Sequence, residues 1–301
     1  MTDMQLGLYM PDRDRETLAG MLREDPLQAQ TALPAMDRPD CVYVARLDSR
    51  LAGYLAINGF GRRTHAALYV APAFRRRGIG TALLRLADGL FAGNEAVELA
   101  CGVCMEDDRE AIQVLYRHGY YRGHGAFTME RRGGPLPESD HVIRLYEDAD
   151  YPAWHRVYES AFWPMRAATK QLPVYYFPPS EKERQRLAAS REDHYVLIAE
   201  GGIAAIGGVL DMHPLVAVRH DLQRRGYGRA MMSFLVNEIM RRSGEPVVEL
   251  GLVQGNPAQF LYESLGFVVT ERLACMKRYY RPDSIPSAPP EGFMPQSEMP
   301  E

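Results

Sequence analysis

A turn with two glycines and two arginines has the residue types of a phosphate-binding site. It occupies residues 223–228 and reads Gln223, Arg224, Arg225, Gly226, Tyr227, Gly228. An apolar run at 215–218 precedes it and apolar residues at helical spacing follow it, which predicts a strand, a turn and a helix. The first N–H groups of a helix have no intrahelical partner, and the helix dipole adds positive potential there, so such a turn suits a phosphate. Glycine lets the backbone approach the anion and adopt a positive φ.

The same pattern occurs 148 residues earlier (226 − 78). An apolar run at 66–70 precedes this second turn, which reads Arg75, Arg76, Arg77, Gly78, Ile79, Gly80. A single turn of this kind is weak evidence, because many strand-to-helix turns carry two glycines and bind nothing. Its repetition predicts two similar domains, each with a phosphate cradle. We call residues 75–80 the N-terminal cradle and residues 223–228 the C-terminal cradle.

Composition narrows the class of protein. A chain of 301 residues suits two domains, and 46% hydrophobic with 25% charged residues predicts a soluble globular protein. The net charge of −4 and the lack of a basic stripe argue against nucleic acid as a partner. No apolar run reaches membrane-spanning length, the N-terminus does not resemble a signal peptide, and four cysteines do not make a disulfide framework. We therefore expect a cytoplasmic protein without nucleic-acid or membrane partners.

The two cradles stand at matching places in two similar series of elements. In the first half we predict strands at 5–10, 41–46, 51–57, 66–70, 96–103 and 126–131, and helices at 14–22, after the cradle and from 109. In the second half we predict strands at 141–145, 195–199, 203–210, 215–218, 247–253 and 273–279, and helices around 154–162, after the cradle and at 257–265. A glycine- and proline-rich stretch after Arg131 separates the halves. We expect an N-terminal domain at 1–134, a linker at 135–140, a C-terminal domain at 141–281 and a disordered, proline-rich tail at 282–301.

Two linked motifs in each half resemble the GCN5-related N-acetyltransferase (GNAT) superfamily. Its fingerprint is a [Gln/Arg]-x-x-Gly-x-[Gly/Ala] turn, followed some thirty to forty residues later by a helix that ends in Leu-Tyr-x-x-x-Gly-Phe. Residues 258–267 carry the second motif in full, and residues 111–120 carry a related one. The resemblance covers about residues 1–281. It implies an α/β fold with two tandem domains, each a central mixed, mostly antiparallel sheet flanked by helices.

The resemblance also implies a cosubstrate and its binding residues. Acetyl-CoA would place its pyrophosphate on the backbone N–H groups of the cradle and its pantetheine along the preceding strand. In the second half the implied residues are Val216, Ala217, Val218, Gln223, Arg224, Arg225, Gly226, Tyr227, Gly228, Arg229 and Asn256. In the first half they are Val70, Arg75, Arg76, Arg77, Gly78, Ile79, Gly80 and Thr81. The acetyl group would pass directly to a primary amine of a small molecule or peptide, without a metal and without a covalent enzyme intermediate.

Counting along the second motif distinguishes the halves. In the family, a tyrosine four residues after the motif's alanine protonates the departing thiolate. Ala258, Tyr262 and Gly266 keep that spacing, whereas the same count from Ala111 reaches Leu115 and leaves Tyr116 one residue too late. One residue is about 100° of helix rotation. We therefore expect Tyr262 to be the general acid and the C-terminal half to be the catalyst.

Several other polar residues have both a catalytic and an ordinary interpretation. Glu98 and Glu249 occupy matching strand positions; either could deprotonate the amine, and a structural polar contact is the commoner role of such a glutamate. Asp211 and His213 near the acceptor side fit an ordinary turn better than catalysis. Cys101 and Cys104 lie three residues apart on a predicted strand and so face opposite sides, which does not suit a shared metal. Aromatic residues at 175–177 either wall the acceptor pocket or pack against the first half.

Three alternatives stay open from sequence. The N-terminal half could bind acetyl-CoA without turnover or be the catalyst itself. The whole chain could be a CoA-binding sensor with no turnover. The sequence also leaves open whether the protein is a monomer, with its two halves paired like a dimer, or a homodimer.

Overall fold

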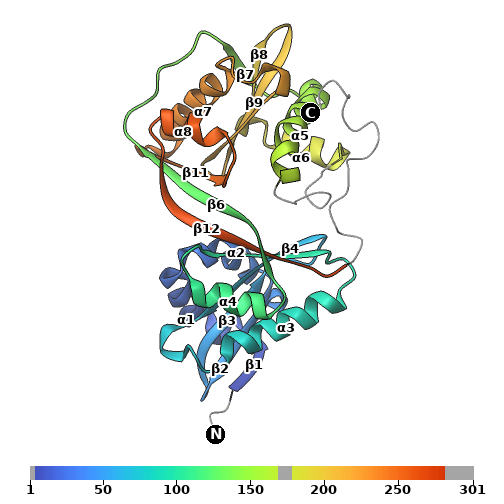
Figure 1. Cartoon of the computed structure of the whole chain (residues 1–301), viewed down its shortest axis with the longest axis vertical. Helices are drawn as coiled ribbons and strands as arrows, with labels where there is room; N and C mark the ends of the chain where they lie inside the picture. Colours follow the sequence, from blue (N-terminus) through green and yellow to red (C-terminus); the bar gives the residue numbers. More distant parts are fainter. Residues whose placement is uncertain (1–3, 169–177, 282–301) are drawn as a thin grey trace. The chain divides into compact units, whose positions relative to one another are not determined.

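The computed structural model describes residues 4–168 and 178–281 (Figure 1). These residues form two compact units. Unit 1 comprises residues 4–125 and 273–281, and unit 2 comprises residues 126–168 and 178–272. The tail expected at 282–301 and the aromatic residues at 175–177 lie outside the described residues.

Unit 1 is a mixed sheet with helices on both faces. Its helices are α1 (Pro11–Glu24), α2 (Pro26–Met36), α3 (Ile79–Gly93) and α4 (Arg109–Arg117). Its strands are β1 (Met4–Leu8), β2 (Val42–Leu47), β3 (Arg50–Ile57), β4 (Arg63–Val70), β5 (Leu99–Met105) and parts of β6 (Tyr121–Arg132) and β12 (Val268–Tyr279), in the order β1-β2-β3-β4-β5-β12-β6. Apolar residues of α1 and α2 pack on one face and those of α3 and α4 on the other. Short 3-10 helices at Pro39–Cys41 and Pro72–Phe74 complete this unit.

Unit 2 contains a four-stranded antiparallel sheet and a second group of strands. The sheet has the order β10-β9-β8-β7, from β7 (Val142–Leu145), β8 (His194–Ala199), β9 (Gly202–Leu210) and β10 (His213–Val218). The second group has the order β12-β6-β11, with β11 at Val247–Val253. The helices are α5 (Tyr151–Ala168), α6 (Glu181–Ala189), α7 (Tyr227–Ser243) and α8 (Ala258–Ser264), with 3-10 helices at Asp148–Asp150, Arg191–Asp193 and His220–Leu222.

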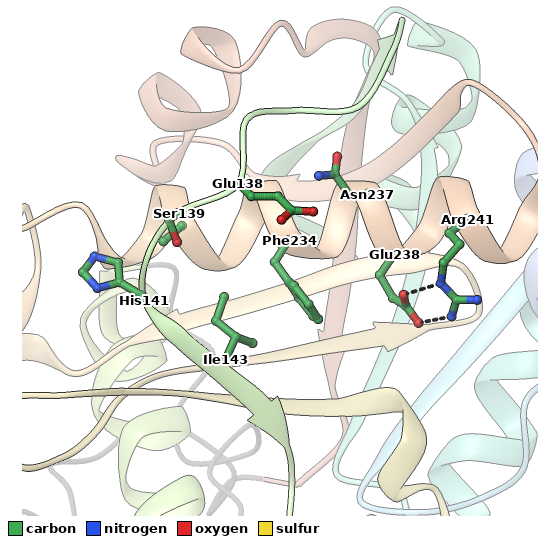
Figure 2. Close-up of a pocket in the computed structure, with 9 residues that line it drawn as sticks. Glu138, Ser139, His141, Ile143, Phe234, Asn237, Glu238 and Arg241 are labelled. Atoms are coloured by element: carbon green, nitrogen blue, oxygen red, sulfur yellow. Dashed lines mark hydrogen bonds and ion pairs between the residues drawn. The ribbon is translucent and has the colours of Figure 1, made fainter.

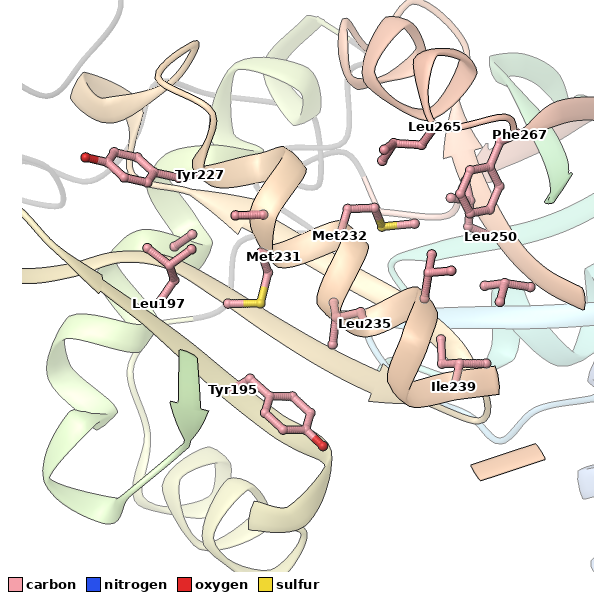
Figure 3. Packing of buried hydrophobic residues seen from close by; sticks show 14 of the residues in the cluster. Tyr195, Leu197, Tyr227, Met231, Met232, Leu235, Ile239, Leu250, Leu265 and Phe267 are labelled. Carbon is pink, nitrogen blue, oxygen red and sulfur yellow. The ribbon is translucent and has the colours of Figure 1, made fainter. Parts of the chain in front are cut away.

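Alternating side chains of β8 and β9 explain why unit 2 has helices on both faces. Tyr195 and Leu197 face α7, whereas Val196 and Ile206 face α5. Figure 3 shows Met231 and Leu235 of α7 packed over this sheet. Gly207 permits the close approach, because a Cβ there would lie 2.5 Å from the sulfur of Met231.

Two long strands cross from one unit to the other. β6 begins in unit 1, and its residues from Ala126 onward pair antiparallel with β11 in unit 2. β12 begins in unit 2, and its residues from Leu273 onward pair antiparallel with β5 in unit 1. The sequence repeats and the compact units are therefore different divisions of the chain.

The elements that local patterns predict are present. The hairpin predicted at 41–57 forms β2 and β3, with Asp48 and Ser49 at positive φ in its turn. The hairpin predicted at 195–210 forms β8 and β9. Some bounds differ: the strands predicted to begin at 126 and 273 begin at Tyr121 and Val268, and the strand predicted from 96 begins at Leu99. The α2 helix, at Pro26–Met36, was not predicted.

Candidate active site

The C-terminal cradle connects the 3-10 helix His220–Leu222 to α7. Arg224 and Gly226 have φ values of 62° and 93°, so the backbone turns twice through the left-handed region. The side chain of Gln223 donates a hydrogen bond from Nε2 to the carbonyl oxygen of Val218 at 3.4 Å, which ties the turn to the end of β10. The turn is thereby fixed to both the strand and the helix that flank it.

This turn presents unpaired backbone donors. Within the described residues, the N–H groups of residues 224–228 have no hydrogen-bond acceptor. They stand at the N-terminus of a 17-residue helix, where the dipole favours an anion. The Tyr227 side chain is buried and its hydroxyl donates to Glu200 at 3.1 Å, so Tyr227 offers the site its backbone N–H rather than its ring.

The arginines of this cradle are exposed at its mouth. Arg225 forms an ion pair with Glu200 at 3.5 Å, with both side chains about half exposed. Exposed pairs of this kind contribute at most about 1 kcal/mol. The pair therefore leaves Arg225 available to a phosphate. No sequence pattern indicates that Glu200, in the β8–β9 turn, reaches this site.

The N-terminal cradle has nearly the same backbone. Arg76 and Gly78 have φ values of 63° and 81°, and Arg75 Nε donates to the carbonyl oxygen of Val70 at 3.0 Å. Arg76 differs from its counterpart Arg224 because it forms an ion pair with Glu110 at 2.7 Å. The repeat therefore preserves the shape of the anion site and changes its charged surroundings.

The strands beside the cradles separate to different extents. In unit 2, β10 and β11 belong to different groups of strands, so the edge of β10 at Val216, Ala217 and Val218 is not paired with β11. In unit 1, β4 pairs with β5 over residues 63–65, and its residues 66–70 are not paired with β5. The open edge of β10 is the one that could receive an extended chain such as pantetheine along its whole length.

Helix α8 is held against the C-terminal cradle. A Cβ at Gly228 would lie 3.4 Å from Leu261 Cδ2 and 3.3 Å from Val218 Cγ2. Arg229, in the first turn of α7, donates to Ser264 Oγ at 2.6 Å. Asn256 Oδ1 accepts from the N–H of Ala258 at 2.9 Å and so satisfies the first backbone donor of α8, whose N-cap residue is Pro257. Neither the Ser264 contact nor this role of Asn256 was predicted from the sequence.

Tyr262 lies on α8 with its hydroxyl unused. The residue is half-buried, its ring lies 6.0 Å from that of Phe267, and its hydroxyl has no hydrogen-bond partner in the described part of the chain. Burial raises the pKa of Tyr262 to about 12. The group is therefore a protonated phenol at neutral pH, free to donate to a ligand.

Helix α4 of unit 1, which matches α8, carries different side chains at the positions that correspond to Tyr262 and Asn256. Leu115 packs against the core of that unit, and the adjacent Tyr116 is 51% exposed. Asp108, rather than Arg109 at the position that matches Asn256, caps α4 by accepting from the N–H of Ala111. A phenol at the position of Tyr262 is thus present in only one of these two helices.

The remaining candidates have ordinary surroundings. Glu249 is exposed on the face of β11 opposite the core residues Val248 and Leu250, and pairs in register with Glu130. Glu98 forms an ion pair with Arg62 at 2.9 Å. Nothing in these contacts distinguishes Glu249 as a base.

The turn residues and the cysteines are equally ordinary. Asp211 and Met212, both at positive φ, form the two-residue turn between β9 and β10, and His213 Nδ1 lies 2.8 Å from the carbonyl oxygen of Asp211. Cys101 and Cys104 are buried. Among the described residues, no group of three or more His, Cys, Asp or Glu is placed to hold a metal ion.

A cavity of about 300 Å³ lies elsewhere in unit 2, between the segment before β7 and helix α7 (Figure 2). Its floor includes Phe234, and Asn237 on the same helix exchanges hydrogen bonds with the backbone of Leu136. Glu238 in its wall is paired with Arg241. The residues that line it include neither the cradle nor Tyr262.

Helices of the described ranges are all too short or too polar to span a membrane.

The family model for the acetyltransferase (GNAT) domain matches residues 38–122 and 190–269, which together are more than half of the chain. The chain therefore belongs to the GNAT acetyltransferases, with two such domains in tandem and an α/β fold of two sheets flanked by helices. It is an acyltransferase of this family, whose members use acetyl-CoA.

Among its relatives is the mycothiol acetyltransferase of Geodermatophilus obscurus, 29% identical over 268 residues, with 81% of this chain and 83% of that protein covered. The [ribosomal protein bS18]-alanine N-acetyltransferase of Escherichia coli is 35% identical over 128 residues, which cover 38% of this chain and 83% of that protein. A GCN5-related N-acetyltransferase from Sphaerobacter thermophilus has a similar fold, with a TM-score of 0.69 at 19% identity over 93% of this chain and 96% of that one. A tandem GNAT protein from the clavulanic acid pathway has a TM-score of 0.61 at 16% identity, over 93% of this chain and 99% of that one. The solved structures support the fold alone.

Proposed function

We propose that this protein is an acetyl-CoA-dependent N-acetyltransferase that acts on a primary amine by direct transfer, with its catalytic site in the C-terminal half. The observation that carries the proposal is the phenol of Tyr262: protonated, without a partner, and borne on a helix that contacts the cradle through Leu261 and Gly228. The first half has a similar cradle, with Leu115 at the corresponding position.

The residues present fit acetyl-CoA. The unpaired N–H groups of residues 224–228, with Arg224 and Arg225, suit its pyrophosphate. The open edge of β10 suits the amides of its pantetheine, because the backbone groups of Val216 and the N–H of Val218 point away from β9 and lack a strand partner on the β11 side. The N-terminal cradle, residues 75–80 with Val70 and Thr81, would hold a second molecule in the same manner without turnover.

Acetyl transfer requires the protein to hold the amine next to the thioester and to supply a proton to the departing sulfur. The neutral amine attacks the thioester carbonyl carbon, a C–N bond forms and the C–S bond breaks. Tyr262 donates its proton to the departing sulfur, and the proton lost by the nitrogen returns to Tyr262 through solvent. Because the pKa of Tyr262, about 12, exceeds that of an ordinary thiol, the phenol first stabilises the sulfur by hydrogen bonding as charge develops, and its proton passes to the sulfur as the proton from the nitrogen replaces it. Glu249 stays a candidate base, although its exposure supports no special role.

The names of the relatives set the range of acceptors to test. One is named for mycothiol and another for the alanine of a ribosomal protein, so a panel must include small-molecule amines and peptide N-termini. We expect CoA release with at least one member of this panel. Acetyl-CoA binding without turnover across the panel would instead favour a sensor.

The acid is tested by Tyr262→Phe, with Tyr116→Phe as the matched control on the corresponding helix. We expect Tyr262→Phe to lower kcat by about 10²-fold or more and to leave the Kd for acetyl-CoA nearly unchanged, because only the proton donor is lost. Tyr116→Phe should retain full activity, since its ring is exposed. Full activity in Tyr262→Phe would exclude this acid, and loss in Tyr116→Phe would move catalysis to the first half.

A further inference from the structure

In the part of the chain that the structure describes, one edge of the unit 1 sheet is a strand that carries large apolar side chains and no charge. β1 is the terminal strand of its sheet, and all five of its residues are exposed. Met4, Leu6 and Leu8 are 40%, 41% and 50% exposed, and Met10 continues the series at 54%. Large apolar side chains at every second position stand on one face of a strand. They form a continuous stripe, unlike single exposed hydrophobic residues, which are common on any surface.

The stripe lies beside a covered surface. Register pairs Met4, Leu6 and Leu8 with Leu47, Ala45 and Tyr43 of β2, which belong to or pack against the core beneath α3. That helix packs on β2, β3 and β4 and does not cover β1. The same face of the sheet is therefore buried up to β2 and exposed at β1.

The backbone at this edge is ready to pair. Tyr9 donates its N–H to the carbonyl oxygen of Val42, which directs the odd-numbered residues of β1 toward β2. In an antiparallel ladder the N–H and C=O of alternate residues point to opposite sides. Those of Met4, Leu6 and Leu8 consequently point to the free edge.

Exposed edge strands usually carry features that prevent pairing, such as charges or proline. The other terminal strands of the two units have them: β7 contains Arg144, β10 contains Pro214 and β11 contains Glu249. Between Met4 and Met10 the chain reads Met-Gln-Leu-Gly-Leu-Tyr-Met, with no charge and no proline. The apolar stripe and the missing protection coincide on the same strand.

We propose that β1 is an interface for a second copy of this chain, with the two β1 strands paired antiparallel and centred on Leu6. This register sets Leu6 against Leu6, and Met4 against Leu8, in both directions. Gln5 and Gly7 likewise lie opposite each other, so every pair matches apolar with apolar or uncharged with uncharged.

The absence of charge on β1 permits the strand to pair with a copy of itself. A two-fold axis places like charges close together, so a strand that pairs with itself must be free of charge near the axis, and residues 4–10 are. The pairing also extends the sheet, so that the two stripes form one apolar surface. The strand is only five residues long, which puts the interface at the small end of specific ones and predicts a weak, concentration-dependent dimer.

The test is the oligomeric state of the full chain across the micromolar range by sedimentation velocity. We expect wild type to pass from monomer to dimer as concentration rises, and Leu6→Lys to weaken dimerisation by about tenfold or more. The control is Leu33→Lys, because Leu33 is 56% exposed and belongs to α2, which packs chiefly on β3 and β4. It should dimerise as wild type does. A wild-type monomer throughout, or equal effects of the two lysines, would overturn the proposal.

Cross-linking tests the register. Opposed residues that exchange backbone hydrogen bonds have Cα atoms about 5.5 Å apart, which is within disulfide range. Leu6→Cys should therefore form a covalent dimer on oxidation. Leu8→Cys should form one only when mixed with Met4→Cys. The described native cysteines are buried or half-buried, so wild type is the blank. A Leu8→Cys homodimer would contradict the register, and failure of Leu6→Cys to cross-link would contradict the interface.

Discussion

The raised pKa of Tyr262 leads to a prediction about how kcat depends on pH. Burial raises its pKa to about 12, so the phenol keeps its proton well above the pH at which an ordinary tyrosine ionises. As an acid it is active below that pKa and inactive above it. We expect kcat to rise with pH as the acceptor amine loses its proton and then to stay level beyond pH 10.

The measurement is a pH profile of kcat for wild type and Tyr262→Phe with one amine. The rising limb should be common to both, because it belongs to the acceptor. A falling limb near pH 10 that is present in wild type and absent in Tyr262→Phe would show that this phenol has an ordinary pKa in the enzyme with its substrate.

At the scale of elements, the two cradles offer a matched pair of substitutions. A Cβ at Gly228 would meet Val218 and Leu261 at 3.3 and 3.4 Å, closer than most real contacts, whereas a Cβ at Gly80 would meet only Val70 at an ordinary 3.8 Å. Neither glycine has a positive φ, so backbone strain is not involved. Gly228→Ala should therefore displace α8 from the cradle, and Gly80→Ala should not disturb α4.

We expect Gly228→Ala to lower kcat/KM by about tenfold, because small displacements of a catalytic group reduce rates steeply. Gly80→Ala should stay within about twofold of wild type. Both are compared by steady-state kinetics, with circular dichroism and thermal melts as the control for folding. A larger loss in Gly80→Ala would indicate that the first half is catalytic.

The elements that could be predicted from the sequence are those that depend on patterns of neighbouring residues. The hairpins and cradles depend on neighbouring residues, so their alternation, glycines and helical spacing suffice. Counting along one helix also separates Tyr262 from Leu115. Helix α2 was missed because it contains Pro34 and has little amphipathic pattern. The contacts of Glu200 with Tyr227 and of Ser264 with Arg229 join residues 27 and 35 positions apart, and no local pattern encodes them.

At the scale of the whole molecule, local patterns do not predict that β6 and β12 cross from one unit to the other. A periodic pattern identifies β6 and β12 as strands. Which strand each one pairs with depends on residues far away in the sequence, so the pattern of the strand alone does not predict it. Met129 of β6 belongs to the core of unit 2, and Met276 of β12 belongs to the core of unit 1. Each sequence half therefore contributes a buried methionine to the core built mainly by the other half.

This exchange predicts reciprocal effects of two substitutions. Both methionines are fully buried, so truncation to alanine should cost about 2–5 kcal/mol of stability in the unit whose core loses the side chain. Met276→Ala should accelerate amide hydrogen exchange in β2, β3 and β5, and Met129→Ala should accelerate it in β8, β9 and β11. Mass spectrometry of peptides from each variant at equal temperature and pH resolves the two sets. If each substitution instead loosened the unit that holds most of its own sequence half, the strands would not be exchanged in solution. Equal loosening of both units would mean that they unfold as one, and the reciprocal assignment of the two cores would fail.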